Sequence, residues 1–544
     1  MKLVDLLNEK GYWNKNRKTK ISLDEAIIDI KKMVELWNKN AFTLISGSYL
    51  LNINSVESDV DFIVVLPFNY NDNNGKFVTK IMLDDEFMGS KSECNYEKRE
   101  ECSEKESLYC FLCKNKATSW LRKITTGVSE INAKIHEYSF DLAFVAYPWE
   151  RNSEQEQNLD NLPIWIFIGI SGPNLDFEKY VDRICEPVFG YRANIRINEI
   201  IVKNKTKFRL LLLSLKLWAK SHFIYDGKLG FFSGTSLAIL VTKILVDFNS
   251  TKMTIFQLLA KFFDVFTYKM IDKIVEDSNN TLVNKQKIDE HLETKLEPIF
   301  IVEETNENIE NLREAIDWNE TKERESRNNL YINNSENVLR DQIIEKQKFL
   351  EEAPPYQKQI LETEIKEKQS LLIKVMLNRK SILEKNAKME KHTKLVWPII
   401  TPGLPKQNAG FNINMSTRKI IWREMKRAHD FIKTNIKNAL KAKSKISKKL
   451  DGNHEDLRNQ WEGLISGGGE FKNKYDQFLA IVCTYNPTNE YGDEFCDFST
   501  TRIRLQLLFS IETEIDAICH ANLQKPIRDK KQCPKEFRKK DGYA

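Results

Sequence analysis

Two aspartates at the start of an apolar run are the residues of this sequence best suited to chemistry. Asp59 and Asp61 open the run 60–66, which is predicted to be a β-strand. Because side chains alternate across a strand, both carboxylates project from the same face. Two carboxylates held close together repel each other unless a cation lies between them, and oxygen ligands suit Mg²⁺ or Mn²⁺. The pattern therefore predicts a metal site, although a lone D-x-D is also common at solvated strand ends.

Two further features favour the metal site. Gly47-Ser48 is followed eleven residues later by the aspartate pair. The backbone amide and hydroxyl of this Gly-Ser can contact a phosphate. A third acid, Asp141, lies in a second predicted strand, 138–145, between apolar flanks. A buried strand rarely holds an unpaired carboxylate. Together these residues predict one site that combines a cation with a phosphate.

The elements that must position these residues are predicted from hydrophobic periodicity. The predicted elements are an amphipathic helix over 23–40, strands over 41–45, 60–66, 138–145 and 164–168, an irregular connection over 69–107, and several buried helices over 207–270. Residues 303–395 are rich in Glu, Lys, Asn and Gln, and Pro354-Pro355 divides them. Apolar positions at spacings of three, four and seven predict a helical hairpin here. A solvated surface excursion and an oligomer contact both fit that hairpin.

Charge and cysteine content constrain the partners and the compartment. The 544-residue chain carries a net charge of only +5, so an RNA surface must be a local basic patch. One such patch is predicted on a helix where every fourth residue is lysine: Lys433, Lys437, Lys441, Lys445 and Lys449. Phosphate contact is favoured there over a solvated face.

The nine cysteines indicate a reducing compartment, and the sequence predicts neither a membrane span nor a signal peptide.

A zinc site was weighed for the four cysteines that precede the second strand. These are Cys94, Cys102, Cys110 and Cys113. Their spacing is irregular, and the C-x-x-C pair fits the apolar face of a helix. Buried structural cysteines are therefore favoured over zinc ligands.

Beyond the three acids, the chain resembles the DNA polymerase β-like nucleotidyltransferase superfamily, and more closely the eukaryotic-type poly(A) polymerases. The superfamily motif is Gly-Ser, then D-x-D, then a third aspartate on a neighbouring strand. The closer resemblance rests on Leu215–Lys220 (LKLWAK), Tyr225 with Gly230–Ser236 (GFFSGTS), Trp397–Asn408 (WPIITPGLPKQN), Ser416–Arg418, Phe471–Tyr475 (FKNKY) and Arg502–Arg504. The chain departs from the family at Ser46, Phe189 and Gly227, where the family has an aromatic residue, an asparagine and an asparagine.

The resemblance implies a role for each matching residue. Asp59 and Asp61 would bind two Mg²⁺ or Mn²⁺ ions, and Asp141 would bind one of them and help to deprotonate the RNA 3′ hydroxyl. Gly47 and Ser48 would hold the β- and γ-phosphates of ATP. The other implied nucleotide contacts are Lys216, Lys220 and Tyr225 at the triphosphate and ribose, and Gly234 and Thr235 at the adenine. Lys134 resembles the family lysine at the primer end, and Lys437, Lys441 and Lys445 of the basic helix are expected to bind RNA.

The combined expectation is an α/β plus α protein of three domains. Residues 20–201 would form a mixed-sheet nucleotidyltransferase domain. Residues 202–429 would form a helical middle domain that carries the insertion of about 303–395. Residues 1–19 could belong to the same domain. Residues 430–544 would form an RRM-like α/β domain. The expected activity is template-independent addition of AMP to RNA 3′ ends, with pyrophosphate released. The rivals are a uridylyl- or CCA-adding transferase and an inactive scaffold that binds RNA ends.

The setting follows from the same resemblance. The Asn-, Lys- and Ile-rich composition resembles the shorter poly(A) polymerases of giant DNA viruses. It implies a cytoplasmic protein, in a viral factory or a virion, with a nuclear protein as the alternative. The partners expected are the RNA 3′ end and ATP, without a membrane, and the helical hairpin could mediate a homodimer.

Overall fold

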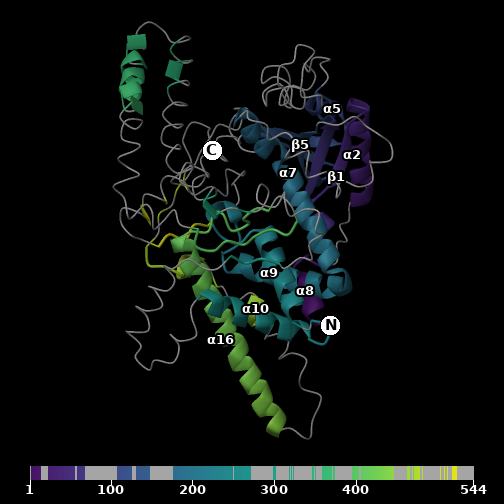
Figure 1. Ribbon diagram of the computed structural model, residues 1–544, viewed down its shortest axis with the longest axis vertical. Helices are drawn as coiled ribbons and strands as arrows, with labels where there is room; N and C mark the ends of the chain where they lie inside the picture. The colour runs from purple at the N-terminus through teal and green to yellow at the C-terminus, as the bar shows by residue number, and fades with distance from the viewer. Residues whose placement is uncertain are drawn as a thin grey trace, which may run out of the picture.

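The protein contains a sheet-based part and a helical part (Figure 1). The computed structural model describes residues 2–13, 22–55, 58–67, 107–124, 130–147, 175–248, 250–270, 298–301, 395–403 and 406–445, with short stretches between 318 and 373 and between 462 and 522. Two separate clusters of buried apolar side chains form the cores of these parts. The sheet positions the three aspartates, and the helical part positions the lysines of the LKLWAK motif.

The sheet has five strands in the order β1-β2-β5-β4-β3. The strands are β1 (Phe42–Ile45), β2 (Val60–Pro67), β3 (Thr118–Ile124), β4 (Glu130–Ile135) and β5 (Tyr138–Tyr147). β2 and β5 are parallel, and the other neighbours are antiparallel. The parallel pair lies inside the sheet, so side chains near the start of β2 lie beside those of β5.

One face of this sheet is apolar because the strands alternate. Phe62 and Val64 of β2 and Phe140 and Leu142 of β5 belong to a single buried cluster. This cluster also contains the apolar side chains of α2 (Leu23–Trp37) and α5 (Leu108–Lys114), so these helices cover that face. α2 begins at Ser22, whose side chain forms a capping box with Glu25. The residues between the buried ones must project from the opposite face.

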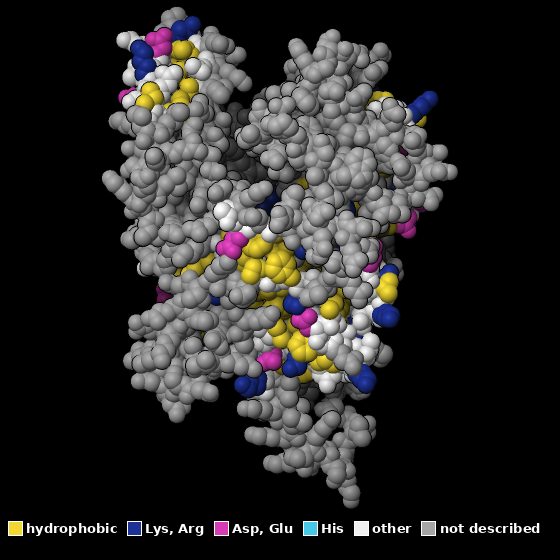
Figure 2. All heavy atoms as spheres, viewed as in Figure 1, with side chains coloured by type: hydrophobic (Ala, Val, Ile, Leu, Met, Phe, Trp, Pro, Cys, Tyr) yellow, Lys and Arg dark blue, Asp and Glu magenta, His cyan; other side chains and the backbone are white. Residues whose placement is uncertain are grey.

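The helical part contains α1 (Lys2–Glu9), α8 (Lys205–Ser221), α9 (Gly234–Asp247), α10 (Ile255–Met270) and α16 (Met415–Lys445). α10 packs against both α9 and α16. Leu3, Leu6 and Leu7 of α1 are buried in the same core as these helices. α7 (Leu175–Ile200) contacts both β5 and α9, so it links the two parts. In the space-filling view, apolar and basic side chains of the helical part lie side by side on the visible face (Figure 2).

The structure confirms the predicted elements that it describes near the aspartates. α2 matches the predicted helix 23–40, and β1, β2 and β5 match the predicted strands at 41–45, 60–66 and 138–145. α8, α9 and α10 confirm the buried helices predicted over 207–270. The sequence reasoning missed β3 and β4. The predicted strand 164–168 and nearly all of the connection 69–107 lie outside the described residues.

Parts of the C-terminal half can be described only locally. α16 runs to Lys445, so the domain boundary predicted at 429/430 falls inside one helix. Among the described residues after 445, there is no strand, and the RRM-like domain stays a prediction. In the insertion, Lys346 forms an ion pair with Glu364, and Ile343 and Ile365 are buried. These contacts bring its two helical stretches together at this level, and residues 361–370 are helical.

None of the described helices is both long enough and apolar enough to cross a lipid bilayer.

Candidate active site

Asp61 and Asp141 are half-buried and lie side by side on two inner strands of the sheet. Asp61 of β2 is the register partner of Asp141 of β5 in the parallel pair. Both flank residues of the apolar cluster, so their carboxylates share the face opposite to α2 and α5. Asp59 comes just before β2 and is exposed. The sequence thus predicted correctly that Asp61 and Asp141 meet on neighbouring strands.

Burial and mutual repulsion both disfavour the charged forms of these acids. Burial and, to a smaller extent, the charges of Asp59 and Glu130 raise the pKa of Asp61 to about 6. Burial likewise raises the pKa of Asp141 to about 7, with contributions from Asp59, Glu130 and Asp61. Each carboxylate therefore makes it costly to ionise the others. Such a group is stabilised in its charged form only when positive charge is supplied.

Gly47 is fixed by its contact with Asp61. Its φ is +58°, and a Cβ added at this position would lie 1.8 Å from Oδ2 of Asp61. The Ser46 amide donates a hydrogen bond to the Asp61 carbonyl at 2.8 Å. A backbone hydrogen bond from Ser48 to the Asp61 carboxylate partly offsets the rise in its pKa. Only glycine fits here, so Gly-Ser is tied sterically to the aspartate, and Ser48 lies at the start of the short helix α3 (Gly47–Leu50).

Lys216 of α8 faces the acids from the helical part. It is buried, with 8% of its surface exposed. Burial and, to a smaller extent, the charge of neighbouring Lys220 lower the pKa of Lys216 to about 8, whereas Asp61 and Asp59 act in the opposite direction. A buried lysine next to carboxylates is a short-range source of positive charge. The lysine also links the two parts of the molecule electrostatically at this site.

Tyr225 lies between the two lysines of the LKLWAK motif. The Nζ atoms of Lys216 and Lys220 are 5.7 Å and 5.5 Å from the centre of its ring. Its hydroxyl is 3.2 Å from the position that a Cβ on Gly234 would occupy, and burial raises its pKa. Lys220 also lies 5.7 Å from the ring of Tyr12, which follows α1. The N-terminal segment therefore reaches this site.

The turn after α8 is built by specific caps. Asp226 caps the short helix Gly227–Leu229, since its side chain accepts from the amides of Lys228 and Leu229. Gly230 then adopts φ +82° beside the Asn412 carbonyl, where a Cβ would approach to 2.6 Å. Ser233 caps α9, which places Gly234 and Thr235 in the first turn of that helix. Both are partly exposed, and for Thr235 no contact with Tyr225 is described.

Two polar residues at the site escaped sequence reasoning. Asn132 of β4 is the register partner of Asp141, and its amide donates a hydrogen bond to Oδ1 of Asp141 at 2.6 Å. The same nitrogen lies 3.4 Å from Oε1 of Glu130. The alternation of Glu130–Ile135 (EINAKI) was the signal, because it places Glu130, Asn132 and Lys134 on one face. β4 therefore adds a fourth acid and a hydrogen-bond donor to the site.

The predicted RNA-binding residues lie apart from one another. Lys134 is exposed on β4, opposite Ser139 and two residues after Asn132. Lys437, Lys441 and Lys445 belong to the last turns of α16, which confirms that this lysine series is helical. Their side chains lie outside the described set. Lys134 thus flanks the acidic face, while the contacts of the basic helix stay a prediction.

Cysteine ligands for zinc are not supported by the described pair. Cys110 and Cys113 are both buried in α5, against the sheet, as predicted for structural cysteines. Cys94 and Cys102 lie outside the described residues. More generally, the described residues contain no group of three His, Cys, Asp or Glu side chains arranged to hold a metal ion as they stand.

The three aspartates at β2 and β5 nonetheless offer ligand atoms that suit a hard divalent cation. Asp59, Asp61 and Asp141 offer carboxylate oxygens only, which Mg²⁺ and Mn²⁺ prefer. Their mutual effect on pKa shows that added positive charge would be favourable. Asn132 occupies one oxygen of Asp141 and leaves the other for a ligand. The chemistry of the residues therefore fits the implied metal, although they would have to adjust to coordinate it.

Comparison with known proteins connects the helical half of the site to one family. Residues 207–291 match the family model for the poly(A) polymerase central domain. This segment includes most of α8, all of α9 and α10, and the turn that carries Tyr225. The match supports the resemblance to poly(A) polymerase-type nucleotidyltransferases that the LKLWAK and GFFSGTS motifs indicate. It covers less than half of the chain.

Some solved structures show partial similarity to this chain. A cytoplasmic RNA terminal U-transferase is 14% identical, with 44% of this chain and 51% of that chain covered and a TM-score of 0.24. The polymerase core of TRAMP, an RNA surveillance complex, is 15% identical over 47% and 61%, with a TM-score of 0.26. The Cid1 poly(U) polymerase is 13% identical over 44% and 53%, with a TM-score of 0.23. The chain thus spans about half to three-fifths of these proteins, and similarity at this level does not indicate which nucleotide it uses.

Proposed function

We propose that this protein is an RNA terminal nucleotidyltransferase that adds AMP from ATP to the 3′ end of RNA. The observation that carries the proposal is the register pairing of Asp61 with Asp141, with Gly47 against Asp61 and Lys216 facing it. This arrangement concentrates negative charge at one point and provides a positive group beside it. The central-domain match over 207–291 supports the same reaction class.

Asp59, Asp61 and Asp141 are the residues that would hold the divalent cations. When bound, such cations polarise the α-phosphate and offset charge on the attacking and leaving oxygens. The reaction forms a bond between the RNA 3′ oxygen and the α-phosphorus, breaks the bond to the β-phosphate, and releases pyrophosphate and a proton. The family resemblance assigns the proton of the 3′ hydroxyl to Asp141.

The other residues position the nucleotide in this scheme. Lys216 and Lys220 would contact the triphosphate, because two ammonium groups on successive turns of α8 face the same side. Lys216 would matter more as pyrophosphate leaves, since the charge grows there. The roles proposed for the remaining residues are Ser48 at the β- and γ-phosphates, Tyr225 at the ribose, and Gly234 and Thr235 at the adenine. The short distance between Gly234 and the Tyr225 hydroxyl supports adjacent ribose and adenine contacts.

RNA would approach from the polar sheet face. Lys134 on β4 lies on the same face as Asp141 and would contact the 3′-terminal nucleotides. The basic helix, with Lys437, Lys441 and Lys445, would contact phosphates farther from the end. A homodimer through the insertion and a cytoplasmic location are further parts of this proposal, and the described contacts do not bear on either.

The experiment that tests the proposal is an extension assay on a 5′-labelled oligoribonucleotide with a free 3′ hydroxyl, with each of the four nucleoside triphosphates in turn. We expect extension with ATP and Mg²⁺, and at least tenfold less with UTP, CTP or GTP. Preferred use of UTP, or ordered addition of C and A, would replace the adenylyl assignment by the rival transferases. No extension by stoichiometric enzyme with any nucleotide would favour the inactive scaffold.

A further inference from the structure

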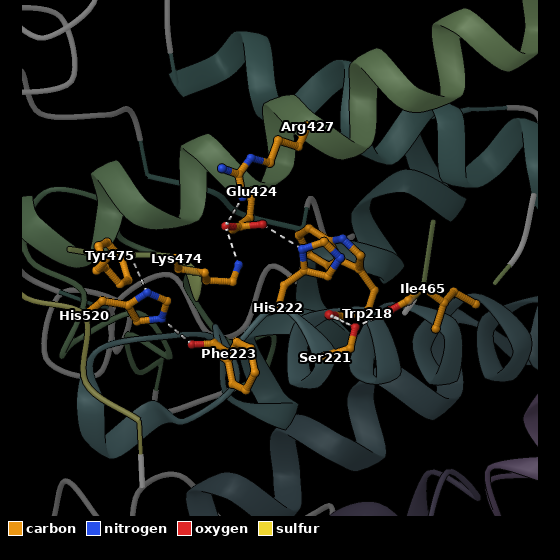
Figure 3. A network of polar contacts seen from close by, with 10 residues as sticks. All are labelled: Trp218, Ser221, His222, Phe223, Glu424, Arg427, Ile465, Lys474, Tyr475 and His520. Atoms are coloured by element: carbon orange, nitrogen blue, oxygen red, sulfur yellow. Dashed lines mark hydrogen bonds and ion pairs between the residues drawn. The ribbon is translucent and has the colours of Figure 1, made fainter. Parts of the chain in front are cut away.

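One histidine near the C-terminus joins both sides of the turn that carries Tyr225. Nε2 of His520 lies 2.7 Å from the carbonyl oxygen of Phe223, two residues before Tyr225. The His520 ring lies 5.1 Å from the ring of Phe231, on the far side of the same turn. We call residues 223–234 the nucleotide turn. His520, from a segment distant in sequence, thus contacts both sides of the turn, and Figure 3 shows its hydrogen bond to Phe223.

The hydrogen bonds around His520 have a fixed direction. A carbonyl can only accept, so Nε2 must carry the proton and donate to Phe223. Nδ1 must then accept from the hydroxyl of Tyr475, 2.6 Å away. Burial lowers the pKa of His520 to about 4, so the ring is neutral near neutral pH, as this arrangement requires. Phe223, His520 and Tyr475 therefore form one directed chain of hydrogen bonds.

Aromatic packing holds the same residues together. Phe471 lies 5.2 Å from Phe223 and 4.9 Å from His520, in edge-to-face geometry. Tyr475 packs edge-on against His520 at 5.5 Å. Phe223 itself has φ +62°, a conformation that is unfavourable for a bulky residue. The C-terminal aromatic residues thus surround a strained position in the turn, and their packing can stabilise it.

A buried ion cluster fastens this C-terminal segment to two helices. Lys474 lies between Phe471 and Tyr475 in sequence, and its Nζ is 2.8 Å from Oε1 of Glu424 on α16. The other oxygen of Glu424 lies 2.6 Å from Nδ1 of His222, which ends α8. All three side chains are buried. Lys474 and His222 therefore contact the same carboxylate, and His222 directly precedes Phe223 (Figure 3). This shared contact links residues 471–475 to the start of the nucleotide turn.

The nucleotide turn transmits these contacts to Tyr225. Tyr225 forms a β-bridge with Phe232, the neighbour of Phe231. The Phe231 amide donates to the Asp226 carbonyl at 3.0 Å, and the Phe232 amide donates to the Ile224 carbonyl at 3.2 Å. Because the turn is closed by these bonds, a shift at Phe223 or Phe231 must move Tyr225. Tyr225 is the ring against which Lys216 and Lys220 lie.

We infer that His520 is a positioning residue for the nucleotide site, through which the C-terminal segment sets the geometry of the nucleotide turn and hence of Tyr225. For ATP as the ligand, this inference rests on the proposed function. It makes the C-terminal segment a structural part of the nucleotide site as well as of any RNA surface nearby. Loosening this segment lowers the affinity for ATP before it affects the acids on the sheet.

The test compares three full-length variants with wild type. His520→Phe keeps an aromatic ring but removes the donor to Phe223. His520→Gln can supply a donor and an acceptor and should restore part of the effect. Thr242→Val is the control, because Thr242 is buried in α9, outside the nucleotide turn, and its hydroxyl hydrogen-bonds within its own helix, to the carbonyl of Ala238 at 2.8 Å. Each is examined by hydrogen–deuterium exchange of residues 224–232 and by steady-state kinetics with ATP varied.

We expect faster exchange in the nucleotide turn of His520→Phe and a KM for ATP raised by about tenfold, with kcat changed less, because misplaced binding groups weaken substrate positioning. His520→Gln should lie between this variant and wild type, and Thr242→Val should match wild type in both readouts. If His520→Phe fails to fold, Tyr475→Phe can replace it, because this variant removes only the hydroxyl that donates to Nδ1 of His520. We then expect a smaller increase in exchange and in the KM for ATP.

Two results would overturn the inference. One is unchanged exchange in the turn of the folded His520 and Tyr475 variants. The other is faster exchange with a KM for ATP within twofold of wild type, which would reduce the contact to a structural role. Failure of wild type to use any nucleotide would refute the proposed function instead, and the exchange measurement would still decide whether His520 holds the turn.

Discussion

Two clusters in this molecule contain carboxylates in opposite electrostatic surroundings. On the inner strands β2 and β5, Asp61 and Asp141 lie beside further acids, and burial together with the charges of these acids raises their pKa values to about 6 and about 7. In the helical part, burial alone would also raise the pKa of Glu424. Hydrogen bonds from His222 and Lys474 outweigh that effect and lower it to about 2. The first cluster requires positive charge, and the second already contains it.

This difference separates a functional arrangement from a structural one. Acids that raise one another's pKa destabilise the fold and are retained where a ligand compensates. An acid with two buried basic partners and Arg427 at 3.0 Å holds elements together. The Glu424 cluster joins α8, α16 and residues 471–475, whereas the Asp61–Asp141 pair joins only strands that already share backbone hydrogen bonds. Four predictions test the contrast.

The largest expected effect is on catalysis. Asp61→Ala or Asp59→Ala should lower AMP incorporation by roughly a thousandfold, because a lost metal ligand removes several kcal/mol of transition-state stabilisation and each 1.4 kcal/mol is a factor of ten. The free energy of unfolding should not fall, since a repelling charge is removed. Single-nucleotide addition and urea unfolding measure the two effects. Activity within tenfold of wild type would remove these residues from the site.

The second effect is on stability. Glu424→Gln leaves His222 and Lys474 buried without their counter-charge and should lower the free energy of unfolding by about 3 kcal/mol. The matched control is Glu364→Gln, because the pair of Glu364 with Lys346 is more exposed. An exposed pair contributes at most about 1 kcal/mol. Urea unfolding of both variants provides the comparison, and equal losses would show that the Glu424 cluster has no special role.

The third effect concerns the lysine that faces the acids. Lys216→Ala should lower kcat/KM for ATP by about thirtyfold, through kcat and KM together, because its charge interacts most strongly with the leaving pyrophosphate. Lys243→Ala is a suitable control, since Lys243 pairs with Asp247 within α9. Steady-state kinetics with ATP varied would measure both. If Lys216→Ala kept the wild-type kcat/KM, Lys216 would not belong to the site.

The smallest effect is a pH dependence of stability. The pKa of Glu424 falls from 4.5 in the unfolded chain to about 2, so its contribution is full above pH 4.5 and is lost as the pH falls towards 2. The pKa of His520 falls from 6.5 to about 4, so its contribution is full above pH 6.5 and is lost as the pH falls through 4. The C-terminal anchor should therefore weaken in acid.

Unfolding free energies at pH 7, 5.5 and 4 would show this loss for wild type. Glu424→Gln should remove the part that appears below about pH 4.5, because one titrating group is gone. An identical pH profile for the variant and wild type would contradict the assignment of that part to Glu424.

The aspartate pair could be predicted from the sequence because its signals are local. Period-two alternation placed Asp61 and Asp141 within apolar strands, and the superfamily resemblance implied that these strands are neighbours. Lys216, Lys220 and Tyr225 were predicted from family resemblance, and the structure brings them together around one ring. The individual roles of all these residues stay predictions.

The parts that were missed depend on pairing over long sequence separations. Asn132 meets Asp141 only because β4 pairs with β5, and β4 is a short strand of mixed polarity between turns. His520 reaches Phe223 across nearly the whole C-terminal half of the chain. Local patterns contain no information on such contacts, since they depend on tertiary packing. Tyr12 was missed for the same reason, because α1 docks on α8 through its leucines.

The account's central claim is that catalysis occurs at the Asp61–Asp141 pair and not at the Glu424 cluster. Addition of one AMP to a labelled RNA by Asp141→Asn and Glu424→Gln, measured side by side and normalised to folded protein, tests this directly. We predict that Asp141→Asn loses roughly a thousandfold in rate while Glu424→Gln stays within about tenfold of wild type. Equal losses in the two variants, or a larger loss in Glu424→Gln, would contradict the account.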